Sequence, residues 1–230
     1  MEVRNVQFNF ETRASDSLFI ESIWRTHSER SGTFISTAET HWEMVVTRYK
    51  GQTTINLRGP ETKAKLAPFH KGAEFFGIVF KHGTFMPHLP VNALVNEDVN
   101  LPTAANGALW LHSATWELPN FDNADVFINH LVREGMLVFD TVVEAVLANR
   151  PLDISLRTVQ RRFLRATGLT RGTFEQIGRA QQAASILQKG IPIADAIFQG
   201  GYTDQPHLTR SLKRFVGQTP GQILQQNNAV

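Results

Sequence analysis

Residues 155–163 read Ser-Leu-Arg-Thr-Val-Gln-Arg-Arg-Phe, and residues 204–212 read Asp-Gln-Pro-His-Leu-Thr-Arg-Ser-Leu. The two stretches are imperfect copies of one segment, offset by 49 positions, and the register continues through Gly168 and Gly217. Each copy opens on a residue type, Ser or Asp, that is a favourable helix N-cap. Each ends at a glycine, where a left-handed C-cap is expected. The sequence therefore predicts two short capped helices of similar length.

Each predicted helix has an apolar edge and a basic edge. At helical spacing the buried edges are Leu156, Val159 and Phe163 in the first copy, and Leu208, Leu212 and Phe215 in the second. The outward edges carry Arg157, Gln160 and Arg161 in the first copy, and Gln205, Thr209, Arg210 and Lys213 in the second. Arg and Gln side chains can bond guanine and adenine edges through two hydrogen bonds. Arg162 and Arg165, with Arg214 aligned to Arg165, are better placed for phosphates.

Both basic helices have a predicted helical predecessor. Residues 140–148 precede the first copy and end before Pro151, and residues 193–198 precede the second across Gly200 and Gly201. A helix, a turn and a capped basic helix in this order are typical of a DNA-binding helix-turn-helix. Between the two units, residues 174–188 form one continuous helical pattern with an apolar stripe. If both units bind one face of B-DNA, their basic helices should lie about 34 Å apart.

The charge of the chain is divided along its length. Residues 150–230 hold 11 Lys/Arg and 4 Asp/Glu, a net charge of +7, whereas residues 1–149 hold 12 and 17, a net charge of −5. A basic segment on an acidic body is the electrostatic layout of a nucleic-acid binder with a separate second domain. Double-stranded DNA is therefore the predicted partner.

The N-terminal half has the pattern of a β-rich domain. Residues 18–25, 42–49, 53–58 and 73–80 are short runs rich in β-branched and aromatic residues, separated by turn residues, which is typical of a sandwich or barrel. The segments 108–117 and 122–134 look helical. We expect an α+β protein with a β-rich domain over 1–120 and an all-α domain over 121–230, in which a long helix joins the two helix-turn-helix units.

Three motifs resemble the AraC-type transcriptional regulators, over roughly 123–227. They are Arg179-x-x-x-Ala183-x-x-Ile186-Leu187, then Gly201-Tyr202-x-Asp204-Gln205-x-His207-Leu208-x-Arg210-x-Leu212-Lys213-Arg214, then Gly217-x-Thr219-Pro220. The stretch from Ser155 to Phe163 resembles the first DNA-reading helix of that family. The chain departs from the family pattern at Ile197, where a small Ala is usual at the helix crossing.

The resemblance implies a seven-helix DNA-binding domain. Its base-reading positions fall on Arg157, Gln160 and Arg161 in the first unit, and on Gln205, Pro206 and Arg210 in the second. It also implies a cupin-like N-terminal domain that senses a small-molecule effector and forms a homodimer. Transcription activation and RNA polymerase contact belong to the same expectation, although the residues themselves leave the direction of regulation open. Because Pro206 has no side-chain donor, its base contact must be apolar or absent.

Composition narrows the remaining function classes. The chain has no cysteine, which excludes disulfides, thiolate metal sites and cysteine nucleophiles and fits a cytoplasmic protein. Its start lacks the order of a signal peptide, and its apolar runs are too short to span a membrane. The eight histidines lack metal-ligand spacing, so we expect no metal and no cofactor. The four tryptophans are predicted core residues, with the lining of a ligand pocket as the alternative.

Two other functions compete with a sequence-specific regulator. One is a DNA-targeted enzyme with a catalytic β-barrel, either an oxygenase or a repair protein. The histidine spacing argues against the oxygenase, and the lack of a thiolate acceptor argues against alkyl-transfer repair. The other is a non-specific architectural binder, which Gln160 and Gln205 disfavour because these side chains suit base contacts more than phosphate contacts. We therefore predict a regulator that is not an enzyme.

Overall fold

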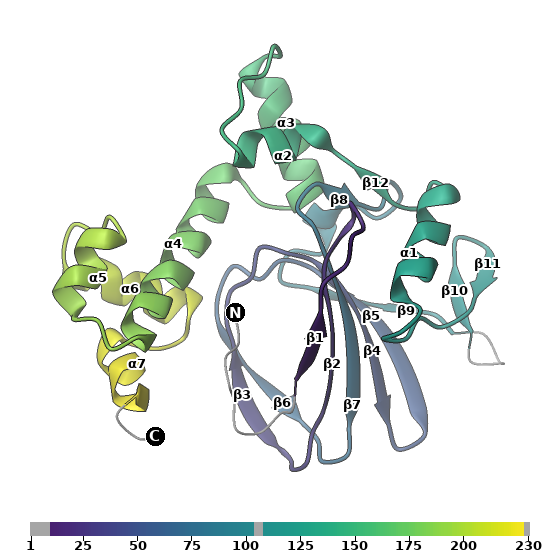
Figure 1. Cartoon of the computed structure of the whole chain (residues 1–230), viewed down its shortest axis with the longest axis horizontal. Coiled ribbons are helices and arrows are strands. Elements are labelled where there is room, and N and C mark those ends of the chain that lie inside the picture. Colours follow the sequence, from purple (N-terminus) through teal and green to yellow (C-terminus); the bar gives the residue numbers. More distant parts are fainter. Residues whose placement is uncertain (1–9, 104–107, 228–230) are drawn as a thin grey trace. The chain divides into compact units, whose positions relative to one another are not determined.

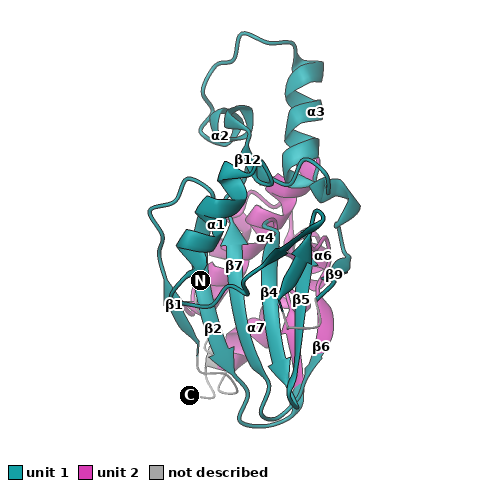
Figure 2. Cartoon of the chain, turned by 90° about the vertical axis from the view of Figure 1, so that its right-hand side faces the viewer, with its two compact units in different colours: residues 1–32, 41–60, 68–169 teal, residues 33–40, 61–67, 170–230 magenta. Residues whose placement is uncertain are grey.

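The computed structural model describes residues 10–103 and 108–227 (Figure 1). Its contacts divide the chain into two compact units (Figure 2). The first unit contains residues 1–32, 41–60 and 68–169, and the second contains residues 33–40, 61–67 and 170–230. Each unit is a group of residues that contact one another in the folded chain. The division into separately folding domains 1–120 and 121–230 remains a prediction.

A six-stranded antiparallel sheet forms the body of the first unit. Its strands, in spatial order, are β1 (Glu11–Arg13), β2 (Ile20–His27), β7 (Glu74–Phe80), β4 (Glu43–Tyr49), β5 (Gln52–Arg58) and β9 (Asp98–Leu101). The four strands predicted from the sequence are confirmed. Ile23, Val45, Ile55 and Ile78 are completely buried on this sheet, as β-branched residues on a half-buried pleated surface should be. The β-rich half is thus established, while its closure into a sandwich, barrel or cupin-like form remains a prediction.

The predicted helix over 108–117 is wrong, because this segment is a β-hairpin. Strands β10 (Leu109–Leu111) and β11 (Ala114–Trp116) pair antiparallel around His112 and Ser113. These two residues have φ angles of 51° and 64°, as a two-residue turn of type I′ requires at both central positions. Three-residue strands hold too few apolar positions to distinguish a period of 2 from one of 3.6. The next predicted helix is confirmed as α1 (Ala124–Arg133).

Helix α1 is tied to the edge of the sheet by one arginine. Arg13 Nη1 lies 2.7 Å from Asp125 Oδ2, and Arg13 Nε and Nη2 donate to the Phe121 carbonyl at 2.9 and 2.8 Å. The Ser15 hydroxyl donates to the same carboxylate. These bonds fix the first turn of α1 against β1.

The remaining helices follow the predicted pattern closely. They are α2 (Thr141–Leu147) and α3 (Leu156–Thr167) in the first unit, and α4 (Arg171–Gln188), α5 (Ile193–Gln199), α6 (Gln205–Phe215) and α7 (Pro220–Asn227) in the second. The predicted stripe of α4 is buried, because Ile177, Ala180, Ala184 and Leu187 are all at most 2% exposed. Within residues 10–103 and 108–227, no helix combines the length and the apolar character needed to cross a bilayer.

Two short ribbons complete the fold. Strand β12 (Val138–Phe139) pairs with β8 (Thr84–Phe85), and β3 (Gly32–Ser36) pairs with β6 (Lys65–Phe69). The 3₁₀ helix η1 (Val91–Ala93) follows β8. The ribbon β8–β12 and η1 belong to the first unit together with α3, whereas residues 33–40 and 61–67 belong to the second unit together with α6.

Candidate nucleic-acid interface

Helix α3 has the caps that the sequence predicts. The Ser155 hydroxyl accepts from the Thr158 N–H at 3.3 Å, and Gly168 ends the helix with a φ angle of 72°. Phe163 is buried and Val159 half-buried, as predicted. Leu156 was also predicted to be buried, but it is 71% exposed. It is the first residue of the helix, at an end where residues 153–157 are all exposed, so its periodic position does not bring it into the core.

The outward edge of α3 is free to contact a partner. Arg157, Gln160 and Arg161 are all exposed. Within the part of the chain that the structure describes, none of the three makes a side-chain hydrogen bond or ion pair. Two guanidinium groups and one amide therefore present their donors to solvent, and this donor set suits base edges and phosphates.

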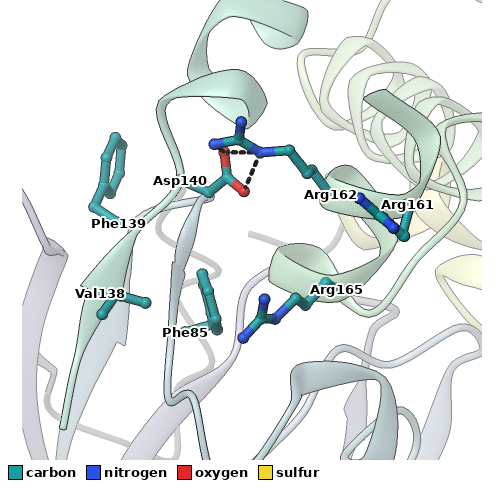
Figure 3. Close-up of a pocket in the computed structure, with 7 residues that line it drawn as sticks. All are labelled: Phe85, Val138, Phe139, Asp140, Arg161, Arg162 and Arg165. Carbon is teal, nitrogen blue, oxygen red and sulfur yellow. Dashed lines mark hydrogen bonds and ion pairs between the residues drawn. The ribbon is translucent and has the colours of Figure 1, made fainter. Parts of the chain in front are cut away.

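Arg162 is held differently from its neighbours, as Figure 3 shows. Its Nε lies 2.9 Å from Asp140 Oδ2 and its Nη2 lies 2.7 Å from Asp140 Oδ1. The same carboxylate caps α2 by accepting from the Val142 N–H at 2.9 Å. The hydrogen bond to Asp140 raises the pKa of Arg162. Arg162 thus joins α2 and α3, the two helices of the first helix-turn-helix, and its predicted phosphate contact must use the donors that Asp140 leaves free.

The first helix-turn-helix packs directly on the β-rich part of the same unit. The Arg165 guanidinium lies over the Phe85 ring, 4.8 Å from its centroid. At Gly168, an added Cβ would lie 2.9 Å from the Val91 carbonyl oxygen, so this close approach requires glycine. Strand β8 and η1 therefore both contact α3 at its C-terminal end, at Arg165 in the last turn and at the Gly168 cap. Asp140 and Phe85 were not predicted as site residues, because no local sequence pattern links either of them to α3.

Helix α6 is the counterpart of α3 in the second unit. Asp204 caps it by accepting from the His207 N–H at 2.7 Å. Its predicted buried edge is confirmed, since Leu208, Leu212 and Phe215 are at most 3% exposed. Of the predicted contact residues, Gln205, Pro206, Arg210, Lys213 and Arg214 are exposed and Thr209 is half-buried. We refer to α3 and α6 together as the reading helices.

The turn between α5 and α6 is closely packed. Gly201 has a φ angle of 61°, and the Tyr202 side chain is buried, with its hydroxyl 3.0 Å from the Ser211 hydroxyl. Burial raises the pKa of Tyr202 more than its hydrogen bond lowers it. Ala196 is completely buried and Ile197 only half-buried, so the small residue at the crossing is Ala196. The departure at Ile197 therefore does not place a bulky side chain at the completely buried position of α5.

Segments 33–40 and 61–67 bind the C-terminal end of α6. The Ala38 N–H donates to the Phe215 carbonyl at 2.6 Å, and the Ala64 N–H donates to the Arg214 carbonyl at 2.7 Å. These bonds satisfy two of the carbonyls that every helix leaves open in its last turn. At Gly217, with φ 78°, an added Cβ would lie 2.8 Å from Ile35 Cγ2. The sequence did not predict these contacts, which join residues 150 to 182 positions apart.

A cavity whose lining includes no residue of a reading helix lies in the first unit. It has a volume of about 570 Å³ between the β10–β11 hairpin and α1, and its lining includes Trp116, Phe127 and His130. Trp42 and Trp116 are core residues as predicted, whereas Trp110 is 45% exposed. Within the described residues, no group of three or more His, Cys, Asp or Glu side chains could hold a metal ion.

Two capped basic helices, each preceded by a helix and a turn, define a double helix-turn-helix protein of the DNA-binding class. Comparison with known families agrees with this geometry, because residues 149–226 match a family model described as a helix-turn-helix domain. The match supports the AraC-type helix-turn-helix that the sequence motifs resemble, and it supports DNA-binding transcription regulation. The comparisons with curated proteins and with solved structures give no match.

Proposed function

We propose that this protein is a sequence-specific transcription regulator in which α3 and α6 each enter a major groove of DNA. The observation that carries the proposal is the free edge of α3. Arg157, Gln160 and Arg161 are exposed and have no side-chain partner in the described chain. Unpaired guanidinium and amide groups on the outer edge of a helix-turn-helix helix are the groups that read bases in such proteins.

The proposed contacts differ in kind along each reading helix. In α3, Arg157, Gln160 and Arg161 contact bases, while Arg162 and Arg165 contact phosphates. In α6, Gln205, Pro206 and Arg210 occupy the base-facing positions, and Thr209, Lys213 and Arg214 lie beside them. Arg162 reaches a phosphate only with the donors that Asp140 leaves free, so its contribution to binding is the smallest of the α3 arginines.

Selection of bound sequences from a random DNA pool tests this proposal, followed by affinity measurements on the selected site. Replacing Arg161 or Arg210 with Ala should cost about 1–3 kcal/mol on that site and relax preference at one or two base pairs. Lys71→Gln is the matched control, because Lys71 is an exposed cation on a turn of the first unit outside the helix-turn-helix segments. Equal weakening on selected and random DNA would reassign both arginines to phosphate contacts.

The salt dependence of binding tests the electrostatic part separately. If six or more phosphates are contacted, affinity should fall on the order of 10³-fold between about 50 and 200 mM salt. A nearly flat response would contradict the DNA-binding proposal as a whole. Failure to select any sequence, with a steep salt response, would instead indicate a non-specific binder.

We propose further that a small-molecule effector bound to the N-terminal β-rich domain controls this regulator in the cytoplasm. One cavity in the first unit supports an effector, because its volume of about 570 Å³ falls within the common range for ligand sites, about 300–1,000 Å³, and residues 114–117 of the N-terminal half line one side of it. A homodimer and contact with RNA polymerase complete the proposal. Dimerisation would add affinity by linking two DNA sites. Sedimentation of the full-length protein across a concentration series tests it, and a monomer at every concentration would contradict it.

A further inference from the structure

A cavity of about 620 Å³ lies in the first unit beside the first reading helix (Figure 3). Its apolar lining is Phe85 from β8 with Val138 and Phe139 from β12. Its polar lining is Asp140, at the start of α2, with Arg161, Arg162 and Arg165 from α3. One side of the cavity is therefore aromatic and aliphatic, and the other consists mainly of guanidinium groups.

The cavity keeps an excess of positive charge. The single negative charge of Asp140 is paired with Arg162, which the carboxylate binds through both of its oxygens. Arg161 has no hydrogen bond or ion pair in the described chain, and Arg165 contacts the face of the Phe85 ring. Two guanidinium groups thus remain without an anion. Such groups bind carboxylates and phosphates through paired hydrogen bonds.

The apolar side is rigid. Phe85 is buried and pairs with Val138 in the β8–β12 ribbon. Next to it, the Thr84 carbonyl accepts from Trp42 Nε1 at 2.7 Å, and the Asp140 N–H donates to the Gly83 carbonyl at 2.8 Å. A floor held in this way loses little conformational freedom when it binds a ligand. The sugar–phosphate backbone of DNA has no aromatic ring to place on such a floor, whereas a ring-bearing organic anion has one.

We propose that this cavity binds a small organic anion, namely a carboxylate or a phosphate monoester that carries a ring. The anionic group lies between Arg161 and Arg165, and the ring lies against Phe85, Val138 and Phe139. The consequence for regulation rests on the proposed function, because Arg161 is also a predicted base-reading residue. One guanidinium cannot serve the anion and a base together, so the anion weakens DNA binding, and DNA weakens anion binding by the same factor.

The binding half is tested without DNA, by ligand-observed NMR and calorimetry on the full-length protein. The probes are phenyl phosphate and phenylacetate, with inorganic phosphate as the probe that lacks a ring and 2-phenylethanol as the probe that lacks a charge. We expect at least one ring-bearing anion to bind about tenfold or more tightly than either control, because each control lacks one of the two groups that the cavity recognises.

Variants locate the bound probe. Arg165→Gln should weaken it about tenfold or more, which is the loss of a charge-assisted hydrogen bond. Val138→Glu places a carboxylate on the floor and should abolish binding, while Val138→Gln has the same shape without the charge and should bind more tightly than Val138→Glu. Lys71→Gln should leave the affinity unchanged. Equal thermal midpoints of the two Val138 variants show that charge, and not misfolding, separates them.

Three outcomes would overturn the inference. Absence of binding by both ring-bearing anions removes the site. If neither Arg165→Gln nor Val138→Glu changes the affinity for the ring-bearing anion, that anion binds elsewhere on the protein. Equal affinity for inorganic phosphate and phenyl phosphate makes it a plain phosphate site, as for a DNA phosphate. Because these measurements contain no DNA, their failure is distinguishable from failure of the proposed function. For the regulatory half, saturating phenyl phosphate should weaken DNA binding, and an unchanged DNA affinity would contradict the linkage.

Discussion

Replacing Asp140 with Asn or with Ala separates two roles of one carboxylate. Asp140 is 8% exposed, caps α2 through the Val142 N–H at 2.9 Å, and binds Arg162 of α3 through both oxygens. Asn keeps an oxygen that can cap the helix but loses the negative charge. Ala removes the cap and the charge together. The difference between the two variants therefore measures the cap, and the effect of Asn measures the charge.

The magnitudes follow from the geometry. Loss of an N-cap costs about 0.5–2 kcal/mol. Hydrogen bonds to a charged group contribute about 1.5–3 kcal/mol, but the Arg162 side chain is 41% exposed, so water replaces part of what is lost. We therefore reduce this contribution to about 1–2 kcal/mol. The expected cost in local opening free energy is about 1–2 kcal/mol for Asp140→Asn and about 1.5–4 kcal/mol for Asp140→Ala.

Hydrogen exchange of the peptide covering residues 141–167 is the appropriate assay, because it reports local opening of α2 and α3 in a chain with two compact units. Arg162→Gln is the matched control, since it removes the ion pair and leaves the cap intact. It should resemble Asp140→Asn, and the double variant should add little to either single one. Exchange in Asp140→Asn at the wild-type rate, or identical exchange in Asp140→Asn and Asp140→Ala, would refute this reasoning.

Three further outcomes are expected. Gly217→Ala should destabilise the second unit by about 1–3 kcal/mol in urea unfolding. It should do so more than Gly190→Ala, since both glycines have positive φ angles but only at Gly217 would the added Cβ lie 2.8 Å from a side-chain atom. Burial raises the pKa of Asp125, but its hydrogen bonds and the Arg13 guanidinium outweigh burial, so this pKa is lowered from its ordinary value of 3.8. The ionised carboxylate therefore stabilises the fold above about pH 4, and the deficit of Asp125→Asn in unfolding free energy should shrink as pH falls below that value. A fragment of residues 121–230 should bind the selected DNA more weakly than the full chain and show no effector response in electrophoretic shift assays. Equal affinity of the fragment would contradict a contribution of the N-terminal half to binding.

The sequence predicted the elements whose signals are local. Caps at Ser155 and Asp204, a terminal Gly168 and a 3.6-residue apolar period lie within one helix, so α3 and α6 appear in the structure with nearly the predicted bounds. Leu156 shows the limit of periodicity, because a residue in phase with the buried edge is still exposed at the end of its helix. The segment 108–117 shows another limit, since its decisive feature is the pair of positive φ angles at the turn.

The contacts that hold the reading helices were not predictable in the same way. Asp140 and Arg162 are 22 residues apart, and Phe85 lies 80 residues from Arg165 in the chain. Neither pair belongs to one periodic pattern, so only the folded chain brings them together. The free edge of α3 is the opposite case. Arg157, Gln160 and Arg161 make no side-chain hydrogen bond or ion pair within the described residues. Residue type and helical spacing were therefore enough to predict their exposure.

Each reading helix is held by a part of the N-terminal half, and in each case by a different part. Helix α3 rests on β8 and η1, whereas the last carbonyls of α6 accept from residues in segments 33–40 and 61–67. The first of these segments leads from β2 to β4 and the second from β5 to β7, so both leave and re-enter the same six-stranded sheet. Both segments are therefore covalently continuous with strands of that sheet, and each is linked to the end of α6 by a hydrogen bond.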